Sequence, residues 1–199
     1  MQERRRTAAM GGVTVTTPLC YLAVAAASAL LLLSTAVAPC SAQVVVTIEE
    51  ACRMATSGGA GKVSYDHCVA SLASDARSRD AADLHHLAAL AARIAVEHAA
   101  ATEAKIEDLG EVEESPHARA RLHHCLDLYN AAADVLRDAL DNLHARVYGK
   151  ASQQLAAALG AAESCEDVWK GEEHVPVAAH DREYGRMALV ALGLTSGIA

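Results

Sequence analysis

The chain of 199 residues has a formal charge of −8 at neutral pH, because 25 Asp and Glu outnumber 17 Lys and Arg. It contains no basic stripe that could neutralise a phosphate backbone, which excludes a nucleic-acid partner. There is no Phe and only one Trp, so Ala and Leu are the main candidates for a hydrophobic core.

Residues 1–42 have the features of a secretory signal peptide. Arg4 to Arg6 precede an apolar stretch over residues 19–38, and the small residues Cys40 and Ala42 suit signal peptidase. We expect cleavage after Ala42; the alternative is an uncleaved anchor, since about 20 apolar residues can also span a bilayer. Cleavage removes three Arg and one Glu and leaves 157 residues, the size of one domain, with a charge near −10. No later stretch is long and uncharged enough to cross a membrane, so we expect no membrane contact after cleavage.

Residues 43–78 are predicted to form a helical hairpin. The first segment, VVVTIEEACRMAT, fits a short helix capped by Thr47, with Val46, Ile48, Cys52 and either Met54 or Ala55 on its apolar face. The glycine-rich SGGAGK follows as a turn, and SYDHCVASLAS then forms a second short helix.

Residues 79–199 are predicted to form four helices. We expect these helices over residues 80–110, 115–148, 150–170 and 182–195. Gly110 is expected to end the first, and Gly149 to lie just past the end of the second. Ser115 can cap the second helix, and Pro116 fits its first position, where no N–H is needed. Short connections between the helices predict an all-α, up-down-up-down four-helix bundle that follows the hairpin.

The second of these helices has a long apolar stripe with steps of three and four residues. Its members are Leu122, Cys125, Tyr129, Ala132, Leu136, Leu140, Leu143 and Val147. A helix cannot bury such a stripe alone, so we expect it to be central to the bundle.

Four cysteines remain after signal cleavage: Cys52, Cys68, Cys125 and Cys165. An even number in an oxidising compartment predicts two disulfides, for which three pairings exist. We favour Cys52–Cys68, whose members are separated by 16 residues around the glycine-rich turn, and Cys125–Cys165, whose segments are expected to be antiparallel neighbours. A zinc site is excluded because no C-x2-C or H-x3-H spacing occurs.

Two histidine pairs, His85-His86 and His123-His124, raise the alternative of a metal enzyme. Adjacent helical residues point about 100° apart, so neither pair can converge on one ion. No Ser-His-Asp set follows from the spacing either. The sequence therefore favours a protein that is not an enzyme and that needs no metal or cofactor.

An ordered set of motifs resembles the plant invertase and pectin methylesterase inhibitor family over essentially the whole mature region. The set comprises Cys52, Thr56, Tyr65 and Cys68, then Cys125-Leu-Asp-Leu-Tyr129, then LAAAL at residues 155–159 and Cys165-Glu-Asp167. The resemblance implies a disulfide-closed hairpin on a four-helix bundle, with the second disulfide joining the second and third bundle helices. It also implies non-covalent inhibition of a secreted carbohydrate-active enzyme. The glycine-rich insert and the lack of Phe are similar to the pollen-allergen-like branch.

The resemblance leaves the target open. Some invertase inhibitors of the family have Pro-Lys-Phe in the turn between the second and third bundle helices, where this chain has Tyr148-Gly149-Lys150. This favours pectin methylesterase, with invertase as the alternative and a storage or allergen-like protein without an enzyme target as the third reading. We expect a monomer that binds its target one to one in the apoplast or cell wall, with the vacuole as the other destination.

The outward faces of the two longest helices are the predicted contact surface, and the hairpin is the second candidate. The charged positions chosen there are Glu103, Asp127, Asp134 and Asp138. His85, His86, His123 and His124 lie on the same two helices, and an ordinary imidazole titrates near pH 6.5. We therefore expect target binding to depend on pH.

Overall fold

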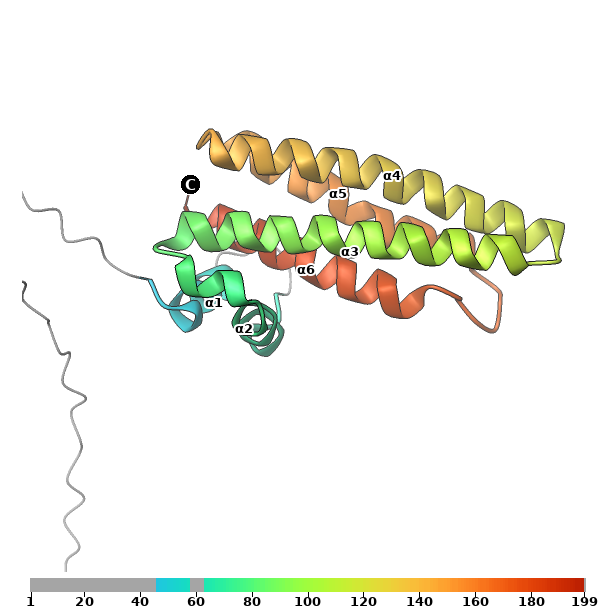
Figure 1. The fold of residues 1–199 in the computed structure, drawn as a ribbon, viewed down its shortest axis with the longest axis horizontal. Helices are drawn as coiled ribbons and strands as arrows, with labels where there is room; N and C mark the ends of the chain where they lie inside the picture. Colours follow the sequence, from blue (N-terminus) through green and yellow to red (C-terminus); the bar gives the residue numbers. More distant parts are fainter. Residues whose placement is uncertain (1–45, 58–62, 199) are drawn as a thin grey trace, which may run out of the picture. The chain divides into compact units, whose positions relative to one another are not determined.

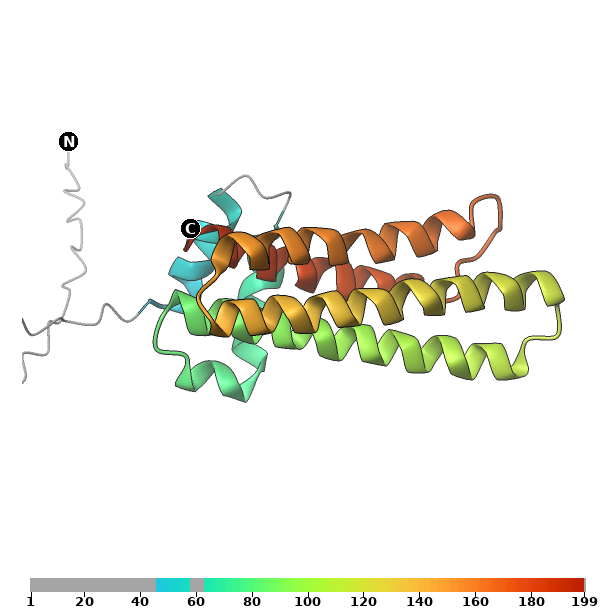
Figure 2. The ribbon, with the colours of Figure 1, turned by 90° about the horizontal axis from the view of Figure 1, so that it is seen from above.

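The computed structural model describes residues 46–57 and 63–198, in which every regular element is helical. The elements in chain order are α1 (Ile48–Ser57), α2 (Tyr65–Ser74), the 3₁₀ helix η1 (Ala76–Asp80), α3 (Leu84–Val112), α4 (Pro116–His144), α5 (Tyr148–Val168) and α6 (Ala178–Ser196). Figures 1 and 2 show α3 to α6 side by side, with α1 and α2 against one end of them. The predicted all-α fold is confirmed. The predicted signal peptide and most of the glycine-rich turn lie outside the described residues.

The four long helices form a closed ring in which each packs against two others. α3 contacts α4 and α6, and α5 contacts the same two helices from the other side. All predicted stripe positions of α4 from Leu122 to Leu136 are buried, as are Tyr184, Met187 and Leu194 of α6. Among the described residues, no helix has the length and hydropathy that a membrane span requires.

The chain has no Phe, and its core contains many buried alanines and two buried tyrosines. The buried alanines of α3, such as Ala88, Ala91 and Ala95, have no exposed surface, because small side chains let neighbouring helices approach closely. Tyr129 of α4 and Tyr184 of α6 meet edge to face with their ring centroids 5.1 Å apart. Such a geometry adds about 0.5–1.5 kcal/mol to the stabilisation from burial alone.

The N-terminal hairpin is closed by a disulfide and packs on α6. Thr47 and Glu50 form a capping box, since each side chain accepts a hydrogen bond from the other residue's backbone N–H at 3.2 Å. Gly193 of α6 is buried where the hairpin arrives; a Cβ built there would lie 3.0 Å from Val63 Cγ2 and 3.1 Å from Ala55 Cβ. The missing side chain at position 193 therefore allows the close approach of α1 to α6.

The helix boundaries agree with the sequence only in part, and the start of α6 lies four residues before the predicted residue 182. The Ser115 side chain accepts a hydrogen bond from the Ala118 N–H, which confirms the predicted cap of α4. Gly110 does not end α3, which continues to Val112 and starts at Leu84 behind its cap Asp83. The separate 3₁₀ helix η1 precedes α3 and shares only Asp80 with the helix expected over residues 80–110.

The predicted end of α4 at Tyr148 is wrong. The helix ends at His144, and Arg146 adopts a left-handed conformation with φ of 57°. The Arg146 N–H donates to the Leu143 carbonyl and the Val147 N–H to the Asn142 carbonyl, which is a Schellman motif. Val147 is consequently 47% exposed in the turn, although the stripe predicts it to be buried.

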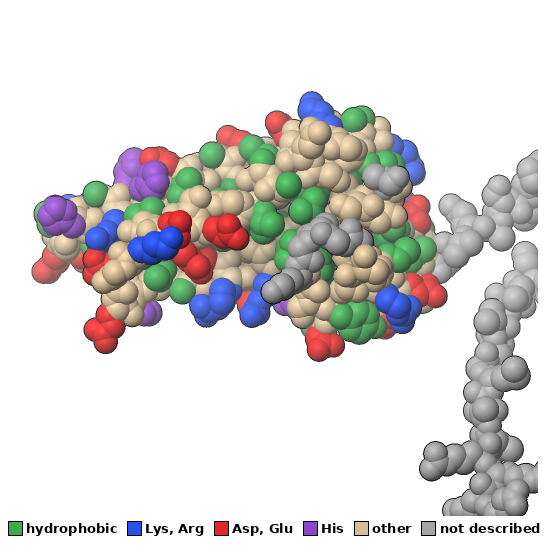
Figure 3. Space-filling model, turned by 180° about the vertical axis from the view of Figure 1, so that it is seen from behind, with side chains coloured by type: hydrophobic (Ala, Val, Ile, Leu, Met, Phe, Trp, Pro, Cys, Tyr) green, Lys and Arg blue, Asp and Glu red, His purple; other side chains and the backbone are tan. Residues whose placement is uncertain are grey.

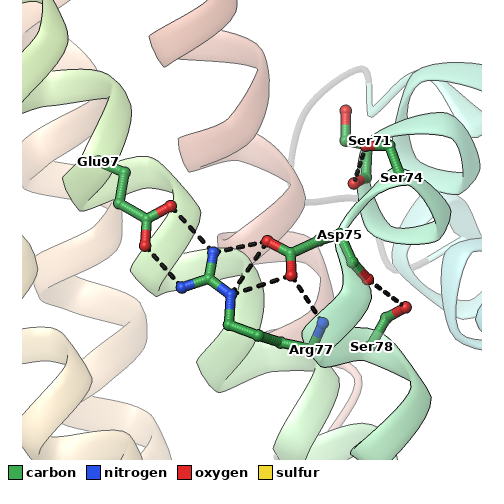
Figure 4. A network of polar contacts seen from close by, with 6 residues as sticks. All are labelled: Ser71, Ser74, Asp75, Arg77, Ser78 and Glu97. Carbon is green, nitrogen blue, oxygen red and sulfur yellow. Dashed lines mark hydrogen bonds and ion pairs between the residues drawn. The ribbon is translucent and has the colours of Figure 1, made fainter.

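An ion-pair network fastens η1 to α3 (Figure 4). The Arg77 guanidinium donates to both carboxylate oxygens of Glu97 at 2.6 and 2.9 Å and to both of Asp75 at distances from 2.5 to 3.1 Å. The Arg77 hydrogen bonds lower the pKa of Asp75 to about 2 and also lower the pKa of Glu97. This network fixes the segment that joins the hairpin to the bundle.

Candidate target-binding surface

Three of the predicted acidic contacts form one exposed stripe on α4. Asp127, Asp134 and Asp138 are spaced by seven and four residues, which puts them on the same face of the helix. The side chains of Asp127 and Asp134 are 64% and 80% exposed. Asp134 pairs with Arg137 at 2.7 Å, and Asp127 lies 3.3 Å from His123. Exposed pairs of this kind contribute about 0–1 kcal/mol, so a partner can displace them at small cost.

Glu103, the fourth predicted acidic contact, differs from the other three. It is half-buried, and its Oε1 has no hydrogen-bond partner within the described part of the chain. Burial raises the pKa of Glu103, and the charge of nearby Arg137 on α4 opposes this. The charges of Arg137 and Asp134, both on α4, act on Glu103, so its carboxylate lies near α4. We correct its assignment from an outward position to one at the boundary of α3 and α4.

The two histidine pairs lie at opposite ends of the bundle. His85 and His86 are in the first turn of α3, whereas His123 lines a pocket together with Glu107 and Gly110 near the other end of that helix. The rise of about 1.5 Å per residue puts some 30 Å between these two places. Figure 3 shows most of the visible histidine side chains at the end of the bundle remote from the hairpin.

The rings of His85 and His86 have different surroundings. His86 is exposed and its Nδ1 lies 2.7 Å from an oxygen of the cap residue Asp83. The half-buried His85 lies 3.3 Å from the Tyr148 hydroxyl, and burial, followed by the charge of Arg146, lowers its pKa. His123 and His124 are both exposed on α4. The four histidines therefore cannot form a single contact.

A concave surface lies beside His123. This pocket of about 370 Å³ has an apolar floor and a charged rim. The floor contains Ile106, Leu122 and Leu126, and the rim contains Glu107, Glu111 and Arg119. An apolar floor with a charged rim is the usual composition of a protein-binding surface.

Sequence analysis missed one buried polar pair that joins α4 to α6. The Tyr129 hydroxyl donates to Asp181 Oδ1 at 2.6 Å, and Asp181 is only 1% exposed. Asp181 Oδ2 has no partner in the described part of the chain. Burial raises the pKa of Asp181 to about 6, the Tyr129 hydrogen bond lowers it, and the nearby charge of Glu166 raises it. The motif containing Tyr129 pointed to one half of this pair, but nothing in the local sequence pointed to Asp181.

Two disulfides tie the surface elements together. Cys52 is bonded to Cys68 in the hairpin, and Cys125 of α4 is bonded to Cys165 of α5. Within residues 46–57 and 63–198, no group of three or more His, Cys, Asp or Glu side chains is arranged to hold a metal ion. The arrangement offers a charged, rigid surface for recognition of another protein.

Known proteins resemble this chain in both sequence and fold. The family described as plant invertase/pectin methylesterase inhibitor matches residues 46–194. Two proteins named "Putative invertase inhibitor" are similar over 135 residues, which is 67% of this chain. The protein from Platanus acerifolia is 29% identical to this chain, and the match covers 75% of its length. The protein from Platanus orientalis is 27% identical, and the match covers 79% of its length.

Two crystal structures of pectin methylesterase inhibitors from Arabidopsis share the fold. A mutant form superposes with a TM-score of 0.59 at 22% identity, covering 66% of this chain and 87% of the other. The second has a TM-score of 0.55 at 20% identity, covering 72% and 93% respectively. At these identities the structural likeness shows the fold alone. The family match, which spans the hairpin and all four bundle helices, shows that the chain belongs to the plant invertase/pectin methylesterase inhibitor family.

Proposed function

We propose that the mature chain, residues 43–199, is a secreted inhibitor that binds non-covalently to a plant cell-wall pectin methylesterase. The observation that carries this proposal is the family match over residues 46–194, which is a family of enzyme inhibitors. The exposed Asp127, Asp134 and Asp138 stripe on α4 supports it, because the opposite side of the same helix is fully used by the core. The inhibitor acts by covering its target and performs no chemistry itself.

Two observations favour pectin methylesterase as the target. The turn between α4 and α5, residues 145–147, reads Ala-Arg-Val and contains no Pro-Lys-Phe tripeptide. Tyr148-Gly149-Lys150, which the sequence suggested as the position of the tripeptide, forms the first turn of α5 and is not part of the connection. The two Arabidopsis structures compared above are both described as pectin methylesterase inhibitors.

Invertase is the second candidate target. It is favoured by the names of the two Platanus relatives, which are more similar in sequence than the two crystal structures. Assaying the purified mature chain against one secreted pectin methylesterase and one cell-wall invertase separates the candidates. We expect inhibition of the esterase; inhibition of the invertase alone would reassign the target.

A storage or allergen-like role without an enzyme target is the remaining alternative. We propose a monomer in the apoplast or cell wall, bound one to one to its enzyme. Immobilised mature chain should retain an esterase from a cell-wall extract, identified by mass spectrometry. Retention of neither a glycosidase nor an esterase would favour the storage role.

A further inference from the structure

A second pocket, on the hairpin side of the bundle, is rich in cationic side chains. It has a volume of about 320 Å³ and lies where η1 meets the first turns of α3 and the end of α4. The polar residues that line it are Arg77, Asp80, His85, His86, Arg93 and His144. The rest of its lining consists of two alanines and a leucine. This is a local concentration of positive charge on a chain whose mature part is strongly acidic.

Carboxylates of the chain neutralise only part of this charge. Arg77 is occupied by Asp75 and Glu97, and His86 pairs with Asp83 at 2.7 Å. Arg93 and His144 have no carboxylate within ion-pairing distance in the described part of the chain. The pocket therefore offers an arginine and a histidine that form no close ion pair within the described residues, although the charge of Arg93 also acts on Glu97.

The surroundings of His85 show the same excess of positive charge. It faces Asp83 and His86 from its own helix, His144 from α4, Arg146 from the following turn and Tyr148 from α5. Arg146 donates a hydrogen bond to the Tyr148 hydroxyl at 3.3 Å, and that hydroxyl lies 3.3 Å from His85 Nδ1. Of these neighbours, only Asp83 favours a charged imidazole, and it is already paired with His86. A bound anion would offset the repulsion among these cations.

Flat rings add a second kind of recognition beside the charges. The His85 ring meets His86 and Tyr148 edge to face, with centroid distances of 5.3 and 5.9 Å. The pocket volume is at the lower end of the range of about 300–1,000 Å³ for small-ligand sites. A single charged sugar ring fits this size, and the imidazole rings of His85 and His86, which line the pocket, can pack against its C–H groups.

We propose that this pocket binds a carboxylate of an acidic polysaccharide, a chain of uronic acid residues. Arg93 would hold the carboxylate through its planar fork of N–H donors, with His144 as a second cation. The choice of a uronate rests on the proposed function, because hydrolysis of the methyl esters of pectin leaves free uronate carboxylates. The inhibitor would thus be retained on the polymer that its target enzyme has already processed.

Binding should be stronger in an acidic medium. Between pH 7.5 and 5.5 an ordinary imidazole gains charge, whereas a carboxylic acid with a pKa below about 4.3 stays ionised. The pocket is lined by three imidazoles, those of His85, His86 and His144, and by one acidic side chain, Asp80, which opposes an anion. Burial lowers the pKa of His85, so its protonation needs a lower pH than that of an ordinary imidazole.

The test uses the whole mature chain without any enzyme. The probes are de-esterified oligogalacturonate and the same oligosaccharide fully methyl-esterified, measured by titration calorimetry at pH 5.5 in low salt. We expect binding of the acid form, at least about tenfold weaker binding of the ester, and at least about fivefold loss in the double variant Arg93→Gln/His144→Gln. Arg53→Gln/His117→Gln removes the same two side-chain types from exposed positions elsewhere and should bind like the natural chain.

Other outcomes would overturn the proposal. Equal binding of acid and ester, or equal losses in both double variants, would show that the pocket does not recognise uronate. Equal binding of poly-glutamate would show a general polyanion surface and contradict polysaccharide recognition. Because no enzyme is present, failure here leaves the inhibition assays unaffected, and a chain that binds uronate but inhibits no esterase would contradict only the proposed function.

Discussion

Asp181 is the one buried acidic residue among residues 46–57 and 63–198, and its protonation should control stability in mildly acidic media. Its pKa is raised by burial from the ordinary value of 3.8 to about 6. The folded state therefore binds a proton more tightly than the unfolded state between these two values. The stabilisation is fully present below pH 4 and is lost as the pH rises through 6. This trend agrees with the acidic cell wall that we propose as the location of the protein.

Asp181→Asn should remove this part of the pH dependence. At 1.36 kcal/mol per pKa unit, the natural chain should lose about 3 kcal/mol of unfolding free energy at this site between pH 4 and 7. The variant keeps an acceptor for the Tyr129 hydroxyl but cannot ionise. Urea unfolding at pH 4, 5, 6 and 7 would measure the difference between the two chains.

Comparing the two chains isolates the effect of Asp181, because other titratable groups change the unfolding free energy with pH in the opposite direction. The lowered pKa values of His67 and His85 make stability rise with pH below 6.5 in both chains, and Asp75 titrates below pH 4. Asp127→Asn, at an exposed position, is the control and should follow the natural chain. Parallel curves for the natural chain and Asp181→Asn would show that Asp181 is not preferentially protonated in the folded state.

Arg146 has an unfavourable backbone conformation, with φ of 57°. It occupies the left-handed position that closes the Schellman motif of α4, where glycine carries no steric cost. Arg146→Gly should raise the unfolding free energy by about 0.5–1 kcal/mol, less the loss of its hydrogen bond to Tyr148. Thermal unfolding that shows Arg146→Gly to be clearly destabilised would mean that the Tyr148 contact outweighs backbone strain.

Gly149→Ala should also stabilise the folded chain, because Gly149 lies in the first turn of α5 with open space around its Cα.

Element boundaries show which features are local in the sequence. Ser115 and Pro116 specify the start of α4 because the cap needs only neighbouring backbone groups. Gly110 and Gly149 misled the prediction, since each is tolerated inside a helix whose buried neighbours hold it in place. The turn at Arg146 depends on how α4 and α5 pack, which no local pattern of residues reveals.

The two disulfides connect elements of unequal importance. Cys125–Cys165 joins two bundle helices across 40 residues, whereas Cys52–Cys68 closes 16 residues of the hairpin. On the chain-entropy model the two loops are worth roughly 4 and 3 kcal/mol. The longer loop should therefore contribute more to the stability of the whole domain.

Replacing Cys125 and Cys165 by Ala should lower the melting temperature more than replacing Cys52 and Cys68. The expected difference of about 1 kcal/mol corresponds to some 2–4 °C for a domain of this size. Calorimetry of both double variants measures it, and peptide mapping of the natural chain checks the pairing. A larger loss from the hairpin variant would mean that its docking on α6 contributes more than loop closure.

At the level of the whole molecule, the architecture was more accessible to prediction than the binding surface. Apolar spacing of three and four residues, even cysteine number and short connections specify the hairpin and bundle. The pockets beside His123 and Arg93 bring together residues from separate helices. Their existence depends on the packing angles and on side-chain volumes, which the order of residues along one helix does not contain.

Inhibition should be tighter near pH 5.5 than near pH 7.5. An ordinary imidazole gains charge in this range. His123 and His124 are exposed on α4, where a target can reach them, whereas the lowered pKa of half-buried His85 delays its protonation. Changing His85, His86, His123 and His124 to Gln should flatten the dependence, and the pair His123→Gln/His124→Gln should account for most of it. Inhibition constants at both pH values measure this effect. A dependence that persists undiminished in the fourfold variant would assign it to other groups.

The most direct test of the account is inhibition of a purified pectin methylesterase by the natural chain and by Asp127→Lys/Asp134→Lys/Asp138→Lys. The matched control Glu163→Lys/Glu173→Lys/Glu183→Lys makes the same change of charge at exposed positions away from α4. We expect one-to-one inhibition by the natural chain and the control, and at least about tenfold weaker inhibition by the α4 variant, all three having helical circular dichroism. Failure of the natural chain to inhibit the esterase would contradict the proposed function, and equal inhibition by all three folded chains would contradict the α4 surface as the contact.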